Sequence, residues 1–572
     1  MKSRFPWVPW CYLAPNISGF LLFTAVPVVL AFALSLFRWD IFHTPVFVGL
    51  ENFRNLLGFR WTDGTLQPCD PEFWQYLGNT LFLMLAIPVN MLVALLIAML
   101  LNHTLRGMGL FRTLFYLPTI CGGVGMFLLW GYIFAPETGL LNQLLALVGI
   151  SGPGWLTNYH WAKPALMLMG LWGAMGGVNM LLYLAALQGI PAELYEAAEI
   201  DGAGRFRKFV SLTVPLLAPT NFFIFVMSVI SGFQGGFDAA FVLTQGGPAG
   251  STTTLSYYIY NHAFVWFNMG YAAAIALVLF ALVLAITALN WKFGGKIMPH
   301  NRAVQLFFLY LGLILVSVTT AYPLLWMVAV SLQAPGAELS GFRVLLPSSV
   351  TLESYRVVFL ETGFLQAFLN SVFVTVGVTA GQVFTSSLAA YAFARMRFFG
   401  LDRIFLGYLA TMMVPGAVTM IPVFLILRSF GWVDSYLALI VPSMFSAYGT
   451  FLLRQFFLSL PRDLEEAAMV DGCTSWGIYC NVILPLSRNA LLTLTILTFM
   501  GTWKGLLWPL IVTHSADLYT LPLALTKFNE MNVVQWSLLM AGAVIMTLPL
   551  LSLVLFTQRC FTRGILLGAV KG

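Results

Sequence analysis

Hydrophobic residues in this chain form long uninterrupted blocks, and the polar residues are confined to the segments between them. A helix needs about 20 mostly apolar residues to cross the hydrocarbon core of a bilayer. Six blocks of this kind precede residue 292, at 13–37, 80–101, 113–134, 163–187, 221–245 and 269–291. Six more follow, at 305–332, 367–393, 404–427, 436–457, 490–513 and 535–557. We therefore expect twelve spans in two sets of six.

The segment between the two sets, KFGGKIMPHNRAV at 292–304, is polar and basic and contains glycine and proline. We interpret it as a cytoplasmic linker that joins a first half, 1–291, to a second half, 305–572. Hydrophobic residues make up 59% of the chain and charged residues 9%, whereas a soluble domain carries about 25% charged residues. The sequence predicts an all-α polytopic membrane protein embedded in lipid.

Lysine and arginine are distributed unevenly between the predicted loops. Cytoplasmic loops carry an excess of these residues, and an inside N-terminus gives ten inside against four outside in the first half. The second half gives nine against four. Both termini are therefore predicted to be cytoplasmic, and the two halves should be related by a pseudo-two-fold axis along the membrane normal. The basic residues form no stripe, so nucleic acid is not an expected partner.

A repeat with a spacing of 270 residues connects the two halves. The segment PAELYEAAEIDGAGRFRKFVSLTVPLLAP, Pro191–Pro219, matches PRDLEEAAMVDGCTSWGIYCNVILPLSRN, Pro461–Asn489, without a gap. Nine of the 29 aligned positions are identical. Both copies lie between the fourth and fifth predicted spans of their half, on the predicted cytoplasmic side.

Each copy predicts a short helix, a tight turn and a second helix along the membrane surface. Proline suits the first helical turn, paired alanines favour helix and allow close approach of another protein, and the Asp-Gly pair ends the helix. A pair of helices that merely joins two spans is the alternative, but it would not need the same Glu-Ala-Ala-x-x-Asp-Gly in both halves. The expected docking residues are Glu196, Ala197, Ala198, Asp201 and Gly202, with Glu466, Ala467, Ala468, Asp471 and Gly472.

This motif resembles the EAA loop of binding-protein-dependent ABC importers, and the flanking segments resemble the carbohydrate-uptake class. VGLENF at 48–53, LTQGGP at 243–248 and MGYAAA at 269–274 are similar to the first permease of that class. SLAAYAFARMRFFG at 387–400 and LYTLPLAL at 518–525 are similar to the second. The resemblance covers nearly the whole chain. It implies that two permeases, which most members carry as separate chains, are fused here.

The resemblance implies a prokaryotic inner-membrane importer that is not itself an enzyme and binds no cofactor. Two separate ATP-binding subunits, expected to be a homodimer, would bind ATP and Mg, and an extracytoplasmic binding protein would deliver a sugar-like substrate. Glu196 and Glu466 would be the charged contacts of two coupling helices. The second loop departs from the family pattern at Cys473 and Asn489, so we expect the two docking contacts to differ in strength. The chain contains no Walker phosphate motif, in line with separate ATP-binding subunits.

Polar and aromatic residues inside the spans are candidates for a substrate pathway, because a polar group in hydrocarbon is costly. Aromatic faces with a few hydrogen-bonding groups suit a sugar, although a single tryptophan is as often an interface anchor. After Trp503 the family usually shows Asn-Glu, whereas this chain has Lys504–Gly505. Lys504 could pair with Asp238, meet an anionic substrate or extend to the outer surface. The candidates are Trp172, Asn179, Tyr183, Gln234, Phe237 and Asp238 in the first half and Trp503, Lys504 and Trp508 in the second.

We therefore expect a permease that moves a sugar or sugar derivative by alternating access. An importer for an anionic solute, such as a sugar phosphate, is the alternative that Lys504 favours. A twelve-span secondary transporter fits less well, because it would carry several buried ionisable residues and would need no docking loops. A membrane enzyme lacks a catalytic constellation, and the six scattered cysteines contain no CxxC, so no metal site is expected.

Overall fold

The computed structural model of the chain describes residues 7–62, 64–102, 111, 114–115, 117–119, 122–293, 321–336, 350–529 and 535–569. The predicted linker beyond residue 293 and most of the predicted span 305–332 lie outside the described residues. The helices of the first half are α1 Val8–Phe20, α2 Val26–Leu34, α3 Glu51–Leu57, α4 Pro71–Met84, α5 Ala86–Leu101, α7 Val124–Ile133, α8 Leu140–Leu147, α9 Tyr159–Ala174, α10 Val178–Gln188, α11 Ala192–Ile200, α12 Arg205–Lys208, α13 Val214–Leu216, α14 Ala218–Gln234, α15 Phe237–Leu243, α16 Leu255–Tyr260 and α17 Met269–Phe293.

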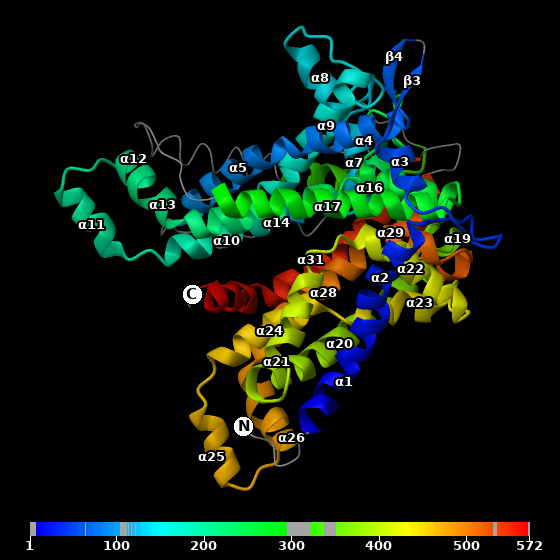
Figure 1. Ribbon diagram of the computed structural model, residues 1–572. Coiled ribbons are helices and arrows are strands. Elements are labelled where there is room, and N and C mark those ends of the chain that lie inside the picture. Colours follow the sequence, from blue (N-terminus) through cyan, green and yellow to red (C-terminus); the bar gives the residue numbers. More distant parts are fainter. Residues whose placement is uncertain are drawn as a thin grey trace.

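The second half is helical in the same way (Figure 1). Its labelled helices are α19 Glu353–Glu361, α20 Phe364–Arg395, α21 Leu401–Thr411, α22 Gly416–Ser429, α23 Tyr436–Ile440, α24 Ala447–Ser459, α25 Asp463–Val470, α26 Ser475–Ile478, α27 Leu484–Leu486, α28 Arg488–Lys504, α29 Leu507–Val512, α30 Leu521–Asn529 and α31 Trp536–Ala569. An apolar helix also covers Ala321–Ser331.

Within the described residues, six helices are long and apolar enough to cross a membrane, and the number rises to 10 if each of four bent helix pairs is one span. The bends are 42° between α9 and α10, 59° before α14, 101° between α21 and α22, and 76° before α28. The predicted spans at 163–187 and 404–427 therefore coincide with bent helix pairs. Glycine or proline lies at these breaks, and both residues disfavour a continuous helix.

The elements that follow the repeated motif recur at the same spacing of 270 residues. The π-helical turn Phe209–Thr213 corresponds to Tyr479–Ile483, and α14 corresponds to α28. A glycine in extended conformation ends each of these two helices, Gly235 in the first half and Gly505 in the second. A short helix, α15 or α29, then follows, so the fifth predicted span of each half is broken rather than continuous.

The first helix of the chain packs against the second half rather than its own (Figure 1). On α1, the Asn16 side chain donates to Thr385 Oγ1 (3.2 Å) and accepts from the Tyr408 hydroxyl (2.8 Å). In the opposite direction, the ring of Trp326, near the start of the second half, stacks on Tyr132 of α7 with centroids 4.3 Å apart. The two halves of the sequence are therefore interlocked in space.

The core that holds the halves together contains large side chains from both. Trp130 and Trp172 of the first half belong to the same buried cluster as Trp503 and Met546 of the second. Helices α7 and α31 approach closely in this cluster, since a Cβ atom on Gly125 would lie 2.7 Å from Ala543 Cβ. Because protein interiors are close-packed, a rearrangement of one half must be accommodated by the other.

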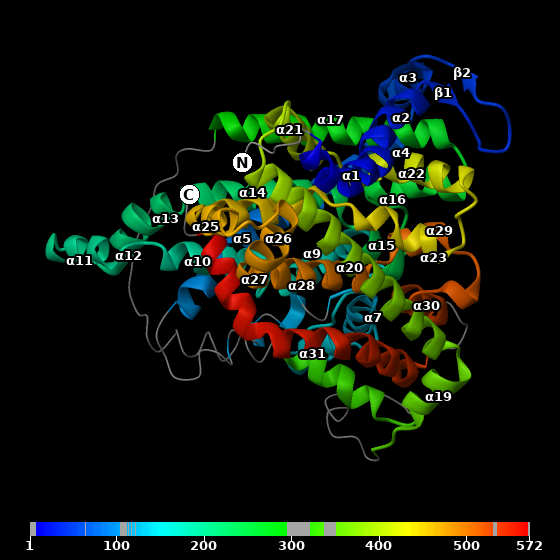
Figure 2. The same ribbon diagram turned by 90° about the horizontal axis from the view of Figure 1, so that it is seen from below.

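Two small antiparallel hairpins lie in the segment between α2 and α4. Strand β1 Phe37–Arg38 pairs with β2 Val46–Phe47, and β3 Phe59–Thr62 pairs with β4 Thr65–Pro68. Figures 1 and 2 place these hairpins at the end of the molecule opposite to α11 and α25. The chain thus has one end with two helical loops and another with the hairpins.

Candidate coupling surface and substrate pathway

The two repeated loops have the same local geometry. In the first loop the amide of Ala203 donates to the carbonyl of Ala198 (2.8 Å), and the equivalent contact in the second loop is 2.9 Å long. Gly202 has φ +72° and Gly472 has φ +82°, a left-handed conformation that is unstrained only for glycine. The Asp-Gly pairs therefore form the helix-ending turns that the sequence predicts.

Both loop helices project from the body of the molecule (Figures 1 and 2). Ile200 at the end of α11 and Val470 at the end of α25 occupy equivalent positions and are each 87% exposed. The expected docking residues are exposed in both loops, except that Ala198 and Ala468 are half-buried. The two loops therefore expose an apolar residue and the motif residues at equivalent positions.

The second loop is fixed to the membrane part by a buried ion pair. Arg395 Nε at the end of α20 lies 2.8 Å from Glu465 Oε1 on α25, and the side chains are 2% and 6% exposed. Burial raises the pKa of Glu465, and the neighbouring guanidinium opposes that shift. In the first loop the equivalent residue is Tyr195, whose hydroxyl lies 2.9 Å from Thr213 Oγ1. Sequence reasoning missed this pair, because its partners are 70 residues apart and only the glutamate is in the repeat.

Four of the predicted pathway residues belong to the packed core. Trp172, Tyr183, Phe237 and Trp503 are all buried. The indole of Trp503 is 1% exposed and donates to the carbonyl of Met546 (2.8 Å). In this conformation these side chains support the helices and present no surface to a solute.

The other five, Asn179, Gln234, Asp238, Lys504 and Trp508, are half-buried. Lys504 ends α28 and donates from Nζ to the carbonyl of Thr119 in the first half (2.9 Å). Among the residues that the structure describes, it forms no ion pair with Asp238. The structure thus places Lys504 in a contact between the two halves. Its roles toward an anionic substrate or the outer surface stay predictions.

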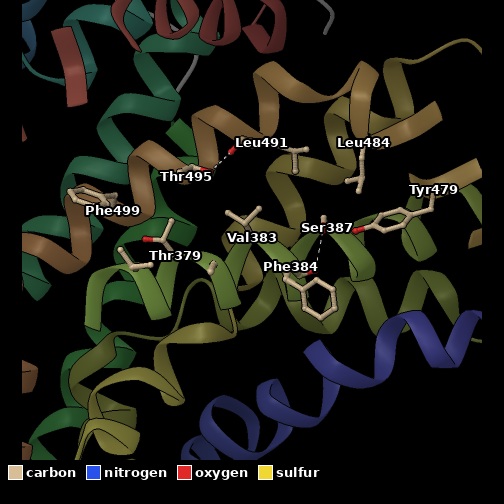
Figure 3. Close-up of a pocket in the computed structure, with 11 residues that line it drawn as sticks. Thr379, Val383, Phe384, Ser387, Tyr479, Leu484, Leu491, Thr495 and Phe499 are labelled. Carbon is tan, nitrogen blue, oxygen red and sulfur yellow. Dashed lines mark hydrogen bonds between the residues drawn. The ribbon is translucent and has the colours of Figure 1, made fainter. Parts of the chain in front are cut away.

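Two pockets lie beside α20, and they differ in chemistry. The larger, about 520 Å³, lies between α20, α28 and the turn before α27, and its walls are mostly apolar (Figure 3). Three of its four hydroxyl groups already have partners within the protein: Ser387 and Tyr479 are bonded to each other (2.8 Å), and Thr495 donates to the carbonyl of Leu491 (2.8 Å). Among the described residues, Thr379 is the one lining residue whose hydroxyl has no partner, so this pocket offers little to a hydroxylated solute.

The smaller pocket, about 270 Å³, lies at the break between α28 and α29, next to the predicted residue Trp508. Sequence analysis singled out Trp508 but missed the hydroxyl residues around it, which come from four separate segments. The serine and threonine residues inside the predicted span 367–393 were the sequence signal that could have revealed these hydroxyl groups. The polar lining and the indole come from Ser371, Thr375, Ser443, Thr502, Trp508 and Thr520.

A helical membrane protein that carries the same protruding loop in each of two interlocked halves has the architecture of an importer permease. The chain belongs to the family of binding-protein-dependent transport system inner membrane components, whose sequence model matches residues 79–292 and again 382–566. This family consists of transport components and not of enzymes.

Individual relatives each correspond to about half of the chain. The chain is 38% identical over 288 residues to the probable ABC transporter permease protein YesP of Bacillus subtilis, covering 50% of this chain and 89% of the relative. It is 33% identical over 268 residues to the arabinooligosaccharides transport system permease protein AraQ of Halalkalibacterium halodurans, covering 46% and 96%. A chain in the crystal structure of a bacterial alginate ABC transporter, in complex with an alginate pentasaccharide-bound periplasmic protein, shares 24% identity with a TM-score of 0.43, covering 51% and 96%. Two family domains in one chain, with relatives of half its length, identify it as two fused permeases.

Proposed function

We propose that this chain is the translocation unit of an ATP-driven importer for a sugar or an oligosaccharide, located in a prokaryotic inner membrane with both termini in the cytoplasm. The observation that carries the proposal is the pair of equivalent loop helices, each ending in an 87% exposed apolar residue at Ile200 and Val470. The permease family and the sugar named for the relative AraQ support the substrate class.

In this proposal α11 and α25 are coupling helices, and each docks on one of two ATP-binding subunits. Closure of these subunits around ATP and Mg would draw the two loops together. Because the halves share a core and exchange their first helices, the loop movement shifts the balance between inward-open and outward-open states of the whole chain. At the opposite end, the segment with the two hairpins would receive the binding protein. Both the ATP and the substrate are thus supplied by partners.

Reversing the charges of both motif glutamates tests the coupling. With binding protein and ATP-binding subunits reconstituted in proteoliposomes, we expect Glu196→Arg plus Glu466→Arg to reduce ATP-dependent uptake of labelled arabinotriose and lactose at least about ten-fold. The reason is that like charges and lost contacts at a docking surface each cost several-fold in affinity. Glu353→Arg, an equally exposed reversal at the start of α19, is the control.

Two results would contradict the coupling role. One is wild-type uptake and wild-type retention of the ATP-binding subunits by the double variant. The other is uptake driven by an ion gradient in the absence of ATP, which would instead support a secondary transporter.

An anionic solute such as a sugar phosphate is the second candidate, and Lys504 is the observation that favours it. A half-buried cation at the break of a membrane helix would attract such a group. Its Nζ already donates to Thr119, which makes a neutral sugar the first choice. Competition by glucose 6-phosphate against lactose uptake in the same proteoliposomes separates the two, since only an anion-selective pathway is inhibited at micromolar concentration.

A further inference from the structure

The smaller pocket lies at the break of the fifth helix of the second half, and it will be called the second-half pocket. Gly501, Thr502 and Gly505 of the α28 end form one wall, and Trp508 and Pro509 of α29 form another. Its volume of about 270 Å³ lies just below the range of about 300–1,000 Å³ typical of small-molecule sites. The second-half pocket is therefore large enough for one ring-sized group and too small for an oligosaccharide.

Several hydroxyl groups in the second-half pocket have unused hydrogen-bonding capacity. Thr375, Ser443, Thr502 and Thr520 line it, and none of their hydroxyls bonds to another residue in the described parts of the chain. The hydroxyl of Thr520 is buried and has no partner among the residues that the structure describes. Ser371 accepts from a backbone amide (2.7 Å) and keeps its own proton to donate. Thr375 and Thr520 are buried residues, and buried polar groups are nearly always paired, so these two hydroxyls indicate a polar ligand.

Trp508 supplies the apolar part of the lining. Its indole N–H donates to the carbonyl of Ala438 (3.0 Å), which fixes the ring at the pocket wall. The ring and the hydroxyl groups together complement a sugar ring, whose C–H face is apolar and whose edge carries hydroxyl groups.

The first half has the same frame of hydrogen bonds around the position equivalent to the second-half pocket. Asn370 on α20 donates from its amide to two carbonyls of a later loop (2.7 and 3.0 Å), and Asn79 on α4 does the same in the first half (2.8 and 3.0 Å). The next residue, Ser371 or Thr80, accepts from the amide of a leucine at the start of a helix (2.7 and 3.1 Å). The two places can therefore be compared residue by residue.

The contents of this frame differ between the halves. Four residues beyond the serine, α20 has Thr375, whereas α4 has Met84 at the equivalent position. Met84 fills the space, since a Cβ atom on Gly232 would lie 2.9 Å from Met84 Cγ. Thr254, the equivalent of Thr520, uses its hydroxyl to accept from a backbone amide of its own helix (3.4 Å). In the first half, Met84 fills this space and the threonine hydroxyl has a hydrogen-bond partner. In the second half, the space is open and the hydroxyl of Thr520 has no partner among the described residues.

We propose that the second-half pocket binds one ring of the transported saccharide. The inference rests on the proposed function and deepens it, because it assigns a ring subsite to the second half alone. Such a subsite would hold one unit of an oligosaccharide at the helix break, next to the contact of Lys504 with the first half, while the remaining units extend beyond the pocket.

Saturation-transfer NMR on the full chain in lipid nanodiscs tests the subsite, with lactose and arabinotriose as probes. We expect transfer from the protein to a ring of at least one probe. Thr375→Met copies the first half and fills the pocket, so it should reduce the transfer at least ten-fold. Thr502→Val plus Thr520→Val keeps the shape and removes two hydroxyls, and should weaken binding roughly five-fold for each. Because this near-isosteric variant disturbs packing little, it tests the subsite even if Thr375→Met fails to fold.

Thr379→Val is the matched control, since it lies one turn further along α20 and lines the larger pocket. It should bind both probes as the wild type does. Absence of transfer to both probes in the wild type, or equal transfer in the double variant and in Thr379→Val, would overturn the subsite. ATP-dependent uptake is measured separately. If uptake occurs but binding is unaffected by the pocket variants, the subsite is wrong and the transport proposal stands. If the pocket variants weaken binding but no uptake occurs, the transport proposal is wrong and the subsite stands.

Discussion

The two coupling loops have the same fold but are attached to the membrane part in different ways. On α25, Glu465 forms a buried ion pair with Arg395, which also donates to the carbonyls of Phe457 (2.5 Å) and Leu460 (2.7 Å). On α11, the equivalent Tyr195 makes only a hydroxyl–hydroxyl contact. The second loop is therefore joined to the ends of two membrane helices, α20 and α24, through a buried charged residue. In the first loop, the ion pair that the described residues show, Glu199 with Lys208 (2.6 Å), lies within the repeated segment itself.

The difference matters because α20 is a single continuous helix. It runs over 32 residues from Phe364 to Arg395 and lines both pockets. Its counterpart in the first half is also one apolar span, Pro71–Leu101, in which a one-residue turn at Leu85 separates α4 from α5. We infer that a displacement of α25 reaches the second-half pocket through one rigid element. Substrate handling and ATP coupling would then be more directly connected in the second half than in the first.

Among the variants that test this difference between the loops, removal of Arg395 is expected to have the largest effect on stability and uptake. Arg395→Met leaves Glu465 buried without its partner, and breaking a buried ion pair from one side costs about 3–5 kcal/mol. We expect a clear fall in the thermal unfolding midpoint of the purified chain in detergent, together with loss of ATP-dependent uptake.

The double variant Arg395→Met plus Glu465→Met is the control for the charge left behind. It should recover much of the stability, because an apolar pair of similar volume often replaces a buried ion pair at little cost. A single variant as stable as the wild type would show that the ion pair does not anchor α25.

The residues that end α14 and α28 give the second contrast. Gln234 and Lys504 are equivalent, and only the lysine is a cation that reaches across to Thr119. Lys504→Gln gives the second half the residue of the first. We expect about 1.5–3 kcal/mol less stability, the range for a hydrogen bond with a charged donor, measured by thermal unfolding.

The uptake of the same variant tests the role of the charge. Lactose uptake should fall only modestly and any inhibition by glucose 6-phosphate should disappear. An unchanged unfolding midpoint would mean that the contact between the halves contributes nothing, and Gln234→Ala provides the matched change in the first half.

The features that the sequence predicted well are those that one segment specifies by itself. Apolar blocks predicted helices, and the repeat predicted two loops with a left-handed glycine at Gly202 and Gly472. The packing of α1 against the second half was not predictable in this way. The block at 13–37 is apolar almost throughout, so no polar face distinguishes the neighbours that it could have.

The candidate pathway was predicted less well, because residue type does not reveal burial inside a membrane protein. Trp503 and Trp508 lie five residues apart with the same chemistry, yet the first is in the core and the second lines a pocket. What separates them is the break at Gly505, which redirects the chain between them. The hydroxyls of Thr375 and Thr520 are 145 positions apart in the sequence and meet only through the fold.

The smallest expected effect concerns the anchor of the first loop. Tyr195→Phe removes the hydroxyl that lies 2.9 Å from Thr213 Oγ1, whereas Thr213 keeps its bond to the carbonyl of Lys208 (3.3 Å). Because no buried charge is left unpaired, the cost should be about 0.5–1.5 kcal/mol, seen as a small shift in thermal unfolding with ATP-dependent uptake retained. If Tyr195→Phe abolished uptake as Arg395→Met is expected to do, the two loops would be equally dependent on their anchors. The asymmetry inferred from the ion pair would then be wrong, whatever the difference in stability.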